Sequence, residues 1–395
     1  MRKVRLKDIG TFYSGLSGKS KKDFSDGNAL LATYRNIFNN PVLNLDIKDT
    51  VVIGNGEKQN EVMYGDILFT GSSETPEEAG MSSVVMSEPK EKIYLNSFCF
   101  GFRLNNIIEV LPSYMGHLLR SEPVRKAISK TAFGVTRFNI NKNFLSEIEI
   151  PLPHLSIQRE IVSVLDSFTT LIDKMKQEVV LRKKQMEYYS EKLFSFEGEE
   201  CDWNTLKELF VIKNGLNKEK KDFGIGTPII NYVDVYKNRG LHKDDIKGLV
   251  NSNESELSRF KCTKGDVFFT RTSETKEEVG FPSVLLDDIE NCVFSGFLLK
   301  ATPITDKLDA HYCKYCFFTN QFRQEVEKRA TLTTRALTNS TSLYKISIPI
   351  PPLSTQRSIV STLDAFEQYI SKLERLITLR EKQYAYYREK LLTFE

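Results

Sequence analysis

The sequence contains a long internal repeat, which restricts the possible folds more than any other feature. The segment Ile150-Pro-Leu-Pro-His-Leu-Ser-Ile-Gln-Arg159 recurs as Ile348-Pro-Ile-Pro-Pro-Leu-Ser-Thr-Gln-Arg357. The two copies then match without insertion or deletion as far as Glu197 and Glu395, and about half of the aligned residues are identical. A repeat of this length predicts two copies of one structural unit, related by an internal pseudo-twofold axis.

The repeat divides the chain into four segments. Segment A covers residues 1–150, segment B 151–197, segment A′ 198–348 and segment B′ 349–395. Segments A and A′ are related more loosely than B and B′, although Gly65-Asp-Ile-Leu-Phe-Thr70 matches Gly265-Asp-Val-Phe-Phe-Thr270. A Gly-Asp turn before an apolar run predicts a turn and a strand. With one helix expected at residues 112–131 and one at 308–330, segments A and A′ are predicted to be globular α+β domains.

Segments B and B′ have the apolar periodicity of a coiled coil. Apolar residues recur at alternating steps of four and three along most of each segment. These positions are Ile161, Leu165, Phe168, Ile172, Met175, Val179, Met186, Tyr189 and Leu193 in the first copy, and Ile359, Leu363, Phe366, Ile370, Leu373, Ile377, Tyr384, Tyr387 and Leu391 in the second. Each copy interrupts the pattern once, with Arg182 and Arg380. An arginine there either sets the register of the helices or extends its charge to solvent.

Each of segments B and B′ predicts one helix of about 40 residues that starts at a candidate N-cap, Ser156 or Ser354. A long amphipathic helix gains most of its stability by packing its apolar face, so each helix needs a partner. We expect the two helices to pack antiparallel, with segments A and A′ at opposite ends of a rod. The alternative is that both helices pair with other chains.

Two loops carry lysines at matching places in the repeat. Gly15-Leu-Ser-Gly-Lys-Ser20 is similar to a phosphate-binding loop, but the motif requires a glycine where this chain has Tyr13. The loop lysines are Lys19, Lys21 and Lys22 in the first copy, and Lys218, Lys220 and Lys221 in the second. These loops either contact phosphates or are ordinary solvated loops.

Two arginines, Arg137 and Arg335, also fall at the same offset, each in a polar segment before the last strand of its domain. An arginine in such a loop contacts phosphates or a guanine edge, or is simply exposed.

The glutamates Glu74, Glu77 and Glu78 recur as Glu274, Glu277 and Glu278, without a histidine fixed near them in both copies. We interpret them as structural or partner-facing. His311, Cys313 and Cys316 have metal-like spacing, but no second pair of ligands accompanies them, so we expect no metal site.

The composition excludes several classes of protein. The net charge is only +3, so a nucleic-acid-binding face must come from local clusters of lysine and arginine. No apolar run approaches the roughly 20 residues that span a bilayer. The basic N-terminal residues are not followed by an apolar stretch, so we expect that they are not a signal peptide. We therefore expect a cytoplasmic protein with reduced cysteines. Motifs for nucleotide binding, cofactor binding, amino methylation and zinc proteolysis are absent, which fits a binding protein with two related modules.

With these motifs, the whole chain resembles the specificity (S) subunit of type I restriction-modification systems. The motifs that carry the resemblance are the Gly-Asp-x-x-Phe-Thr turns, the Pro-x-Leu-x-x-Gln-Arg helix starts and the Tyr-Tyr-x-Glu-Lys-Leu helix ends. The resemblance implies that residues 1–150 and 198–348 are target recognition domains 1 and 2. Residues 151–197 and 349–395 correspond to the helical spacer regions 1 and 2.

The resemblance also implies a function. It implies that each recognition domain reads one half of a bipartite double-stranded DNA site. Our own candidates for the DNA contacts are the loop lysines and arginines described above: Lys19, Lys21, Lys22 and Arg137 in one domain, and Lys218, Lys220, Lys221 and Arg335 in the other. The chain itself is non-catalytic and binds no cofactor. Two methyltransferase (M) subunits bring S-adenosylmethionine, and restriction (R) motor-nuclease subunits bring ATP and Mg. The alternatives are a coiled-coil scaffold with two protein- or ligand-binding modules and no DNA role, and an enzyme with catalytic A segments.

Overall fold

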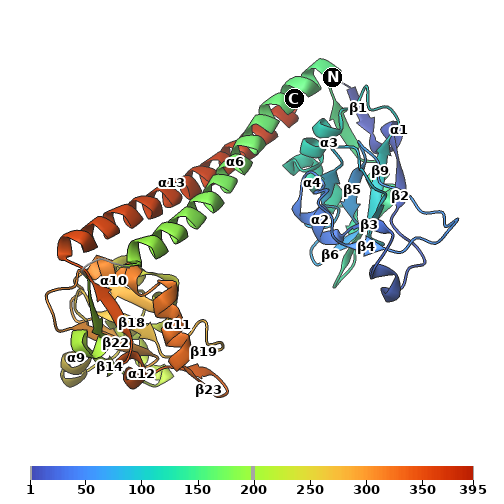
Figure 1. The fold of residues 1–395 in the computed structure, drawn as a ribbon. Coiled ribbons are helices and arrows are strands. Elements are labelled where there is room, and N and C mark those ends of the chain that lie inside the picture. The colour runs from blue at the N-terminus through green and yellow to red at the C-terminus, as the bar shows by residue number, and fades with distance from the viewer. Residues whose placement is uncertain (1, 197–200, 395) are drawn as a thin grey trace. The chain divides into compact units, whose positions relative to one another are not determined.

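The computed structural model describes residues 2–196 and 201–394, which fold into two compact units (Figure 1). Unit 1 contains Met1–Lys176 and Arg375–Glu395, and unit 2 contains Gln177–Glu374. Each unit therefore combines one α+β domain with part of each long helix. The boundary expected between residues 197 and 198, and the last matched residue, Glu395, lie outside the described residues. Within those residues no helix is both long and apolar enough to cross a bilayer.

The domain of unit 1 is built on an antiparallel sheet. Its strands are β1 (Arg2–Arg5), β2 (Gly10–Ser14), β3 (Ala29–Ala32), β4 (Thr50–Val51), β5 (Ile67–Thr70), β6 (Ser72–Ser73), β7 (Ser82–Val84), β8 (Ile93–Leu95), β9 (Cys99–Leu104), β10 (Ala132–Phe133), β11 (Phe138–Ile140) and β12 (Glu149–Leu152). The main sheet has the order β2-β9-β5-β7. Smaller sheets have the orders β4-β3-β8, β10-β11-β6 and β1-β12.

The domain of unit 2 repeats this plan. Its strands are β13 (Asp202–Thr205), β14 (Phe210–Asn214), β15 (Phe223–Ile230), β16 (Gly240–Leu241), β17 (Leu249–Val250), β18 (Val267–Thr270), β19 (Thr272–Ser273), β20 (Pro282–Leu285), β21 (Val293–Phe294), β22 (Leu298–Pro303), β23 (Thr331–Leu332), β24 (Ala336–Leu337) and β25 (Ser347–Ile350). The main sheet has the order β14-β22-β18-β20-β16, in which β16 adds a parallel edge. The smaller sheets are β17-β15-β21, β19-β24-β23 and β13-β25.

The Gly-Asp turn before β5 is held by a buried carboxylate. Gly65 has φ +82°, a conformation that favours glycine. The carboxylate of Asp66 is almost fully buried and accepts hydrogen bonds from the Tyr13 hydroxyl at 2.7 Å and from the Arg103 guanidinium at 2.7 and 2.8 Å. A buried charge is tolerated only when it is paired and hydrogen-bonded, so this network fixes the turn against β2 and β9.

The second copy has the same turn with different partners. Gly265 has φ +92°, and Asp266 is again buried. Its carboxylate lies 3.1 Å from the Lys300 ammonium and accepts a hydrogen bond from the Thr302 hydroxyl at 2.6 Å. The turn and strand expected from the sequence are confirmed in both copies.

The helix expected in each domain is in fact two helices. The short helices of unit 1 are α1 (Leu6–Ile9), η1 (Lys21–Phe24), α2 (Tyr34–Asn39), α3 (Pro112–Leu119), α4 (Glu122–Ser129) and α5 (Lys142–Ser146). Those of unit 2 are α7 (Leu206–Leu209), η2 (Lys220–Asp222), α8 (Tyr232–Lys237), η3 (Lys243–Asp245), α9 (Glu254–Phe260), α10 (Ala310–Cys316), α11 (Asn320–Arg329) and α12 (Ser340–Leu343). The prediction of single helices at 112–131 and 308–330 was wrong. The Ser121 hydroxyl donates to the Leu118 carbonyl of α3, and the Thr319 hydroxyl donates to the Cys316 carbonyl of α10. These hydrogen bonds cap the end of the first helix, and a second helix starts at the next residue.

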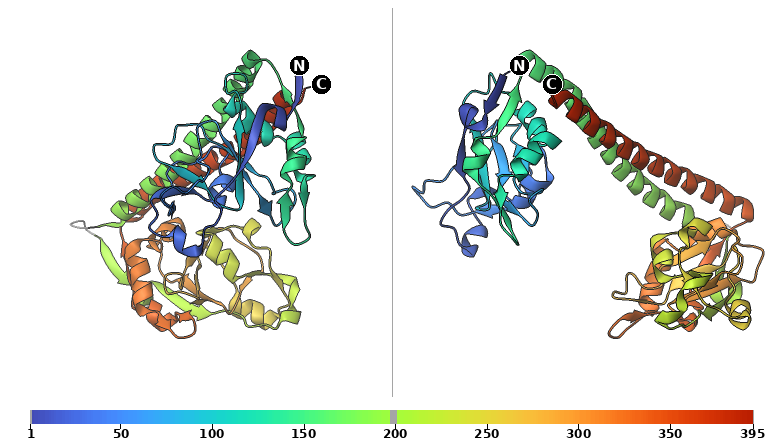
Figure 2. Two further views of the ribbon diagram at one scale, coloured as in Figure 1. Left: turned by 90° about the vertical axis from the view of Figure 1, so that its right-hand side faces the viewer. Right: turned by 180° about the vertical axis from the view of Figure 1, so that it is seen from behind.

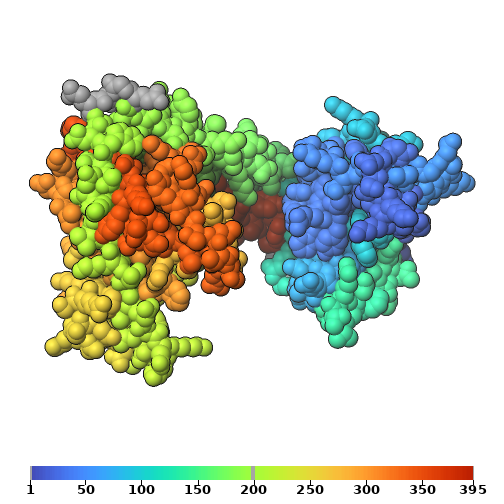
Figure 3. Space-filling model, turned by 60° about the horizontal axis from the view of Figure 1, so that its bottom comes forward, coloured from blue at the N-terminus to red at the C-terminus, as the bar shows by residue number. Residues whose placement is uncertain are grey.

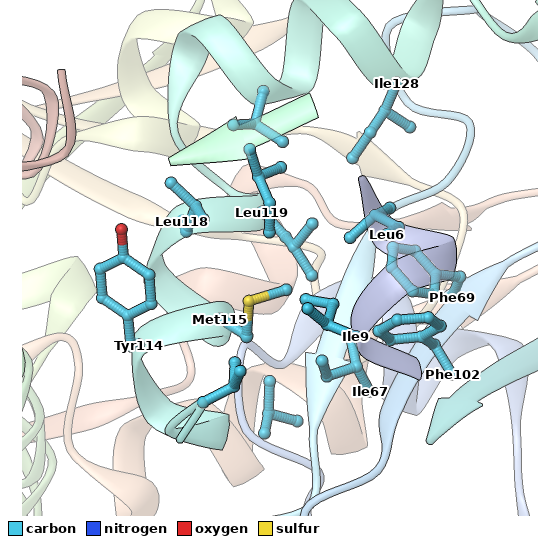
Figure 4. Close-up of a cluster of buried hydrophobic side chains, with 14 of the residues drawn as sticks. Leu6, Ile9, Ile67, Phe69, Phe102, Tyr114, Met115, Leu118, Leu119 and Ile128 are labelled. Atoms are coloured by element: carbon cyan, nitrogen blue, oxygen red, sulfur yellow. The ribbon is translucent and has the colours of Figure 1, made fainter. Parts of the chain in front are cut away.

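The core of unit 1 lies between the main sheet and α3 and α4 (Figure 4). Sheet residues such as Ile67, Phe69 and Phe102 face Met115 and Leu119 of α3. Ile161, Leu165 and Leu392, from the long helices, belong to the same buried cluster. The long helices are therefore part of the hydrophobic core of unit 1.

The two long helices are α6 (Leu155–Phe194) and α13 (Leu353–Leu392). In unit 1 the first part of α6 packs on the last part of α13. There Phe168 stacks on Tyr387, with ring centroids 5.4 Å apart, and Lys176 pairs with Glu381 at 2.7 Å. Early residues of one helix thus contact late residues of the other, as antiparallel packing requires.

Unit 2 contains the reciprocal contacts. Tyr189 stacks on Phe366 with centroids 5.7 Å apart, and Lys183 pairs with Glu374 at 2.8 Å. The expected antiparallel pairing within the chain, and with it the α+β fold with an internal repeat, is confirmed (Figure 2). The helices begin at Leu155 and Leu353, two residues before the starts that the predicted N-caps imply, so Ser156 and Ser354 lie in the first turn rather than at the N-cap.

The glutamine of the repeated Gln-Arg motif clamps each long helix to its domain. Gln158 is fully buried, and its amide nitrogen donates to the Glu109 and Pro153 carbonyls, both at 2.9 Å. Its amide oxygen accepts from the Leu111 N–H at 2.9 Å, just before α3. One side chain therefore joins the helix start to the loop that leads into α3.

The second copy repeats this clamp. Gln356 is fully buried, donates to the Lys307 and Pro351 carbonyls at 2.7 and 2.8 Å, and accepts from the Asp309 N–H at 2.9 Å. The neighbouring arginine of the motif is exposed in both copies. The glutamine is thus the structural half of the motif.

The arginines that interrupt the apolar seam keep their charged groups at the surface. Arg182 donates to Glu178 and Gln185 of its own helix at 2.7 and 2.8 Å, and lies over the Tyr369 ring of α13, 5.3 Å from its centroid. Arg380 donates to Gln383 at 2.7 Å, and within the described residues it has neither an ion pair nor a ring contact. Of the two interpretations, these contacts favour extension of the charge to solvent.

We expect Gln356→Leu to lower the free energy of unfolding of unit 2 by about 1–3 kcal/mol, because three polar backbone groups lose their partner. Gln368→Leu is the matched control, since Gln368 is exposed on the same helix, and it should change stability by less than about 0.5 kcal/mol. Urea denaturation followed by circular dichroism measures both values. Equal effects of the two substitutions would contradict the clamp.

Arg380→Leu should keep or raise the melting midpoint, because leucine extends the apolar seam. Arg182→Leu should lower it relative to Arg380→Leu, because it also removes an ion pair and a ring contact. Differential scanning calorimetry of the two variants measures this difference. If Arg182→Leu melts at the higher temperature, the contacts of Arg182 do not stabilise the helix pair.

Candidate nucleic-acid interface

The first lysine of each basic loop is held by a carboxylate. The side chain of Lys19 is only 8% exposed, and its ammonium lies 2.6 Å from Glu57 and 2.6 Å from the Val52 carbonyl. Hydrogen bonds from Lys19, which has the largest effect, from Gln59 and from the Gly54 N–H lower the pKa of Glu57 to about 2. Lys218, at the matching place, lies 2.8 Å from Glu256. These two lysines hold their loops in place, and their charges are already paired.

The next two lysines of each loop point to solvent. Lys21 and Lys22 lie on η1, and Lys220 and Lys221 on η2, and all four are exposed. Lys221 pairs with Glu219 at 2.7 Å, at an exposed position where such a pair is weak. In the described part of the chain the other three form no ion pair. Of the six predicted loop lysines, these exposed ones are the candidates for phosphate contact.

The predicted arginines lie on a β-hairpin in each unit. The hairpin β10–β11 pairs with β6 and carries Arg137, and the hairpin β23–β24 pairs with β19 and carries Arg335. Both arginines are exposed. Figure 3 shows the orange segment that contains α11 and β23–β24 at the surface of unit 2. In Figures 1 and 2 the dark-blue turn η1 and β6 with its paired hairpin lie at the same end of unit 1.

The two hairpins hold their arginines differently. The Arg137 Nε donates to the Ser72 hydroxyl at 2.9 Å, and its guanidinium lies over the Phe98 ring, 5.2 Å from the centroid. The side chain of Arg335 has no hydrogen bond, ion pair or ring contact with any described residue. Its carbonyl accepts from the Thr333 N–H at 3.0 Å, which closes the hairpin. Arg137 is thus oriented by its surroundings, whereas Arg335 is free to reorient.

Sequence reasoning missed the aromatic residues beside these hairpins. Phe98 is 57% exposed and Phe297, its counterpart, 63%. The backbone N–H groups of Gly71 and Arg271 donate to their carbonyls at 2.7 and 3.0 Å, so both rings lie beside the strand that pairs with the hairpin. Arg271 is exposed and was also missed. The sequence offers one signal. Phe98 and Phe297 stand directly before a buried strand, at a position where the core does not require a phenylalanine.

The glutamates that recur in both copies take part in hydrogen bonds that hold a turn. Glu78 and Glu278 accept hydrogen bonds from Ser73 and Ser273, both at 3.0 Å, in the turn that follows β6 and β19. Arg125 donates to the carbonyls of Glu77, Ala79 and Gly80 in the same turn. This supports the structural interpretation of the glutamate clusters.

Cys313 and Cys316 are buried in α10, and burial raises the pKa of Cys313 to about 12, so its sulfur is protonated at neutral pH. A protonated thiol is a poor metal ligand. Among residues 2–196 and 201–394, no group of three or more potential ligands could hold a metal ion.

Comparison with known proteins places this arrangement in a family. The chain is 31% identical over 275 residues to the EcoR124I/EcoR124II specificity subunit of Escherichia coli, which covers 63% of this chain and 64% of that protein. It is 25% identical over 302 residues to the EcoKI specificity subunit of Escherichia coli strain K12, covering 71% of this chain and 63% of that protein. The matches thus span just under two thirds of the length of these relatives.

Solved structures share the fold. A type I S subunit from M. genitalium has a TM-score of 0.53 at 13% identity and covers all of this chain and 96% of its own. A chain from a study of type I R-M complex assembly has a TM-score of 0.65 at 17% identity, covering 99% and 96%. The model of the type I restriction modification DNA specificity domain matches residues 1–181 and again residues 200–381. Since these two matches cover most of the chain, one in each copy of the repeat, the protein belongs to the family of type I restriction-modification DNA specificity domains.

Proposed function

We propose that this chain is the specificity subunit of a type I restriction-modification system, which reads a bipartite double-stranded DNA target. The observation that carries the proposal is the pair of matching hairpins, each with an exposed arginine at the same place in its unit. A two-stranded β-ribbon fits the major groove of B-DNA, and arginine is the commonest reader of guanine there. Two similar but non-identical readers imply two different half-sites.

The exposed lysines supply the contacts that do not depend on sequence. Lys21, Lys22 and Lys220 carry free charges near the start of each domain, where they can neutralise phosphates and release counterions. With a net charge of +3, these local clusters carry the attraction to DNA rather than the chain as a whole. Partner subunits add further phosphate contacts.

The long helices offer a matching surface to partner subunits in both copies. Leu181 and Tyr188 are 51% and 61% exposed and lie seven residues apart on one face of α6. Leu379 and Tyr386 repeat them on α13, at 48% and 61% exposure. A lysine also occupies the same place on this face in both copies, as Lys184 on α6 and Lys382 on α13. Single exposed apolar residues are ordinary. The same exposed pair in both copies supports the proposal that one kind of partner binds at two sites.

The partners that fit this surface are two copies of an adenine-N6 methyltransferase (M) subunit, and restriction (R) motor-nuclease subunits join that assembly for cleavage. S-adenosylmethionine, ATP and Mg belong to these partners. The chain itself recognises the DNA target and serves as the scaffold of the complex, and it has no catalytic role. The complex acts in the cytoplasm, where the DNA lies. The competing function is a coiled-coil scaffold with no DNA role.

The direct test is to exchange residues 1–152 for the corresponding segment of a related protein, which keeps β1 and β12 together. Selection from a pool of random double-stranded DNA, with and without M subunits, should then give a target that is changed in one half only. The domains of the two units have separate cores, so each should read DNA independently. Exchange of residues 201–350 is the matched control and should change the other half.

Selection of no motif by the parent chain, with or without M subunits, would favour the scaffold without a DNA role. A change in both halves after a single exchange would contradict independent readers.

The partner surface is tested by Leu181→Glu with Tyr188→Glu, and by Leu379→Glu with Tyr386→Glu. Each pair should remove one of two bound M subunits, because the substituted face becomes charged, and all four together should remove both. Native mass spectrometry of the co-purified complex counts the subunits. Val180→Glu is the control, because Val180 is 54% exposed but its counterpart is Thr378. Two bound subunits in the fourfold variant would place the contact elsewhere.

A further inference from the structure

We propose that Arg137 reads a guanine of the first half-site with the outer edge of its guanidinium, and that Phe98 and Ser72 orient it for this contact. The inference rests on the proposed DNA-binding function. It goes further by assigning one base and one set of side chains to unit 1, and it separates Arg137 from the arginine of the second hairpin.

The position of Arg137 follows from the strand register. In the β11–β6 pair, Phe138 is opposite Ser73 and Asn139 opposite Ser72. Arg137 is the last residue before this pair, at the tip of the hairpin. Its side chain extends across to β6, where Nε donates a hydrogen bond to the Ser72 hydroxyl at 2.9 Å. The two terminal nitrogens, on the far side of the group, donate to no described residue and are available to DNA.

The free edge suits a guanine better than a phosphate. In the major groove, guanine presents the acceptors O6 and N7 side by side, and the parallel N–H groups of one guanidinium bind both. Such a contact requires a fixed orientation of the arginine, whereas a phosphate accepts donors from many directions. The Ser72 hydrogen bond and the Phe98 ring fix that orientation before binding, which reduces the entropy lost when DNA binds.

The surroundings of Arg137 are also apolar. Phe98 and Phe133 are each 57% exposed, and Val135 at the hairpin tip is 91% exposed. Exposed apolar side chains gain little from the charged DNA backbone. In the major groove they can contact thymine methyl groups. The patch around Arg137 therefore matches base edges.

Gly134 gives the first hairpin its shape. Its φ is +148°, and a Cβ at this position would lie 1.9 Å from the Arg137 carbonyl oxygen. The tip can therefore close only with glycine there. In the second hairpin Leu332 occupies the equivalent place, and the Arg335 side chain is exposed and has no hydrogen bond, ion pair or ring contact with Phe297 or any other described residue. The oriented arginine is thus a property of unit 1.

The test uses the full chain with its M subunits and a pool of random double-stranded DNA, sequenced after selection. Arg137→Lys keeps the charge but removes the paired N–H groups. It should reduce the preference for guanine at one position of one half-site by roughly 5- to 100-fold, with the salt dependence and the other half-site unchanged. Phe98→Leu should weaken the same preference and no other.

Arg335→Lys is the matched control and should leave the half-site of unit 1 unaltered. The melting midpoint of each variant verifies that it is folded. An unchanged motif for Arg137→Lys overturns the assignment while the proposed function stands. An even loss across all sequences for Arg137→Ala, with a lower salt slope, assigns a phosphate contact and also overturns it. Absence of any motif for the unaltered complex removes both proposals.

Discussion

Burial of the apolar seam between α6 and α13 is the interaction on which both units depend. Neither helix can bury this face alone, and the matching seams make each helix the natural partner of the other. The seam does not end where the globular parts begin. Ile161 and Leu165 at the start of α6, and Leu392 at the end of α13, are buried in the core of unit 1. The helix pair and the domain core are therefore stabilised together.

The two copies keep the same framework but use different polar groups to hold it. His117 of α3 is hydrogen-bonded to Tyr384 of α13 at 3.0 Å and to Asp166 of α6 at 2.7 Å. The equivalent residue of α10 is Tyr315, whose hydroxyl donates to Asp364 of α13 at 2.5 Å. The joint between domain and helices persists although its side chains have changed.

This pattern suits the proposed function, in which the two domains read two different half-sites. The residues shared by the copies, such as the buried glutamines and the Gly-Asp turns, keep the domains in shape. The hairpins, which meet solvent, differ in sequence and in how they hold their arginine. Divergence at the tips leaves the scaffold unaffected, because the tips contribute little to either core.

The sequence was sufficient for the architecture because its main signals are periodic and repeated. The heptad pattern and the candidate N-caps placed the starts of both long helices to within two residues, and the repeat identified two domains. The sequence pattern gave a wrong prediction where a single residue determines the end of a helix. Ser121 and Thr319 each end a helix, although the apolar pattern continues beyond them. It also could not distinguish Lys19 from Lys21. The difference is the ion pair with Glu57, which lies 38 residues away in the chain. The contact of Arg137 with Phe98 was likewise invisible, because it joins two loops that only the folded sheet brings together.

The division of the helices also bears on the order in which the chain folds as it is synthesised. Unit 2 is continuous from Gln177 to Glu374, so all its contacts become available in one stretch. Unit 1 begins first but also contains residues from Arg375 onward. Tyr384 and Leu392, which complete its joint and its core, emerge only after unit 2 has been made. The domain that leaves the ribosome first is thus the last to be finished, and until then the apolar face of the first part of α6 lacks its partner on α13.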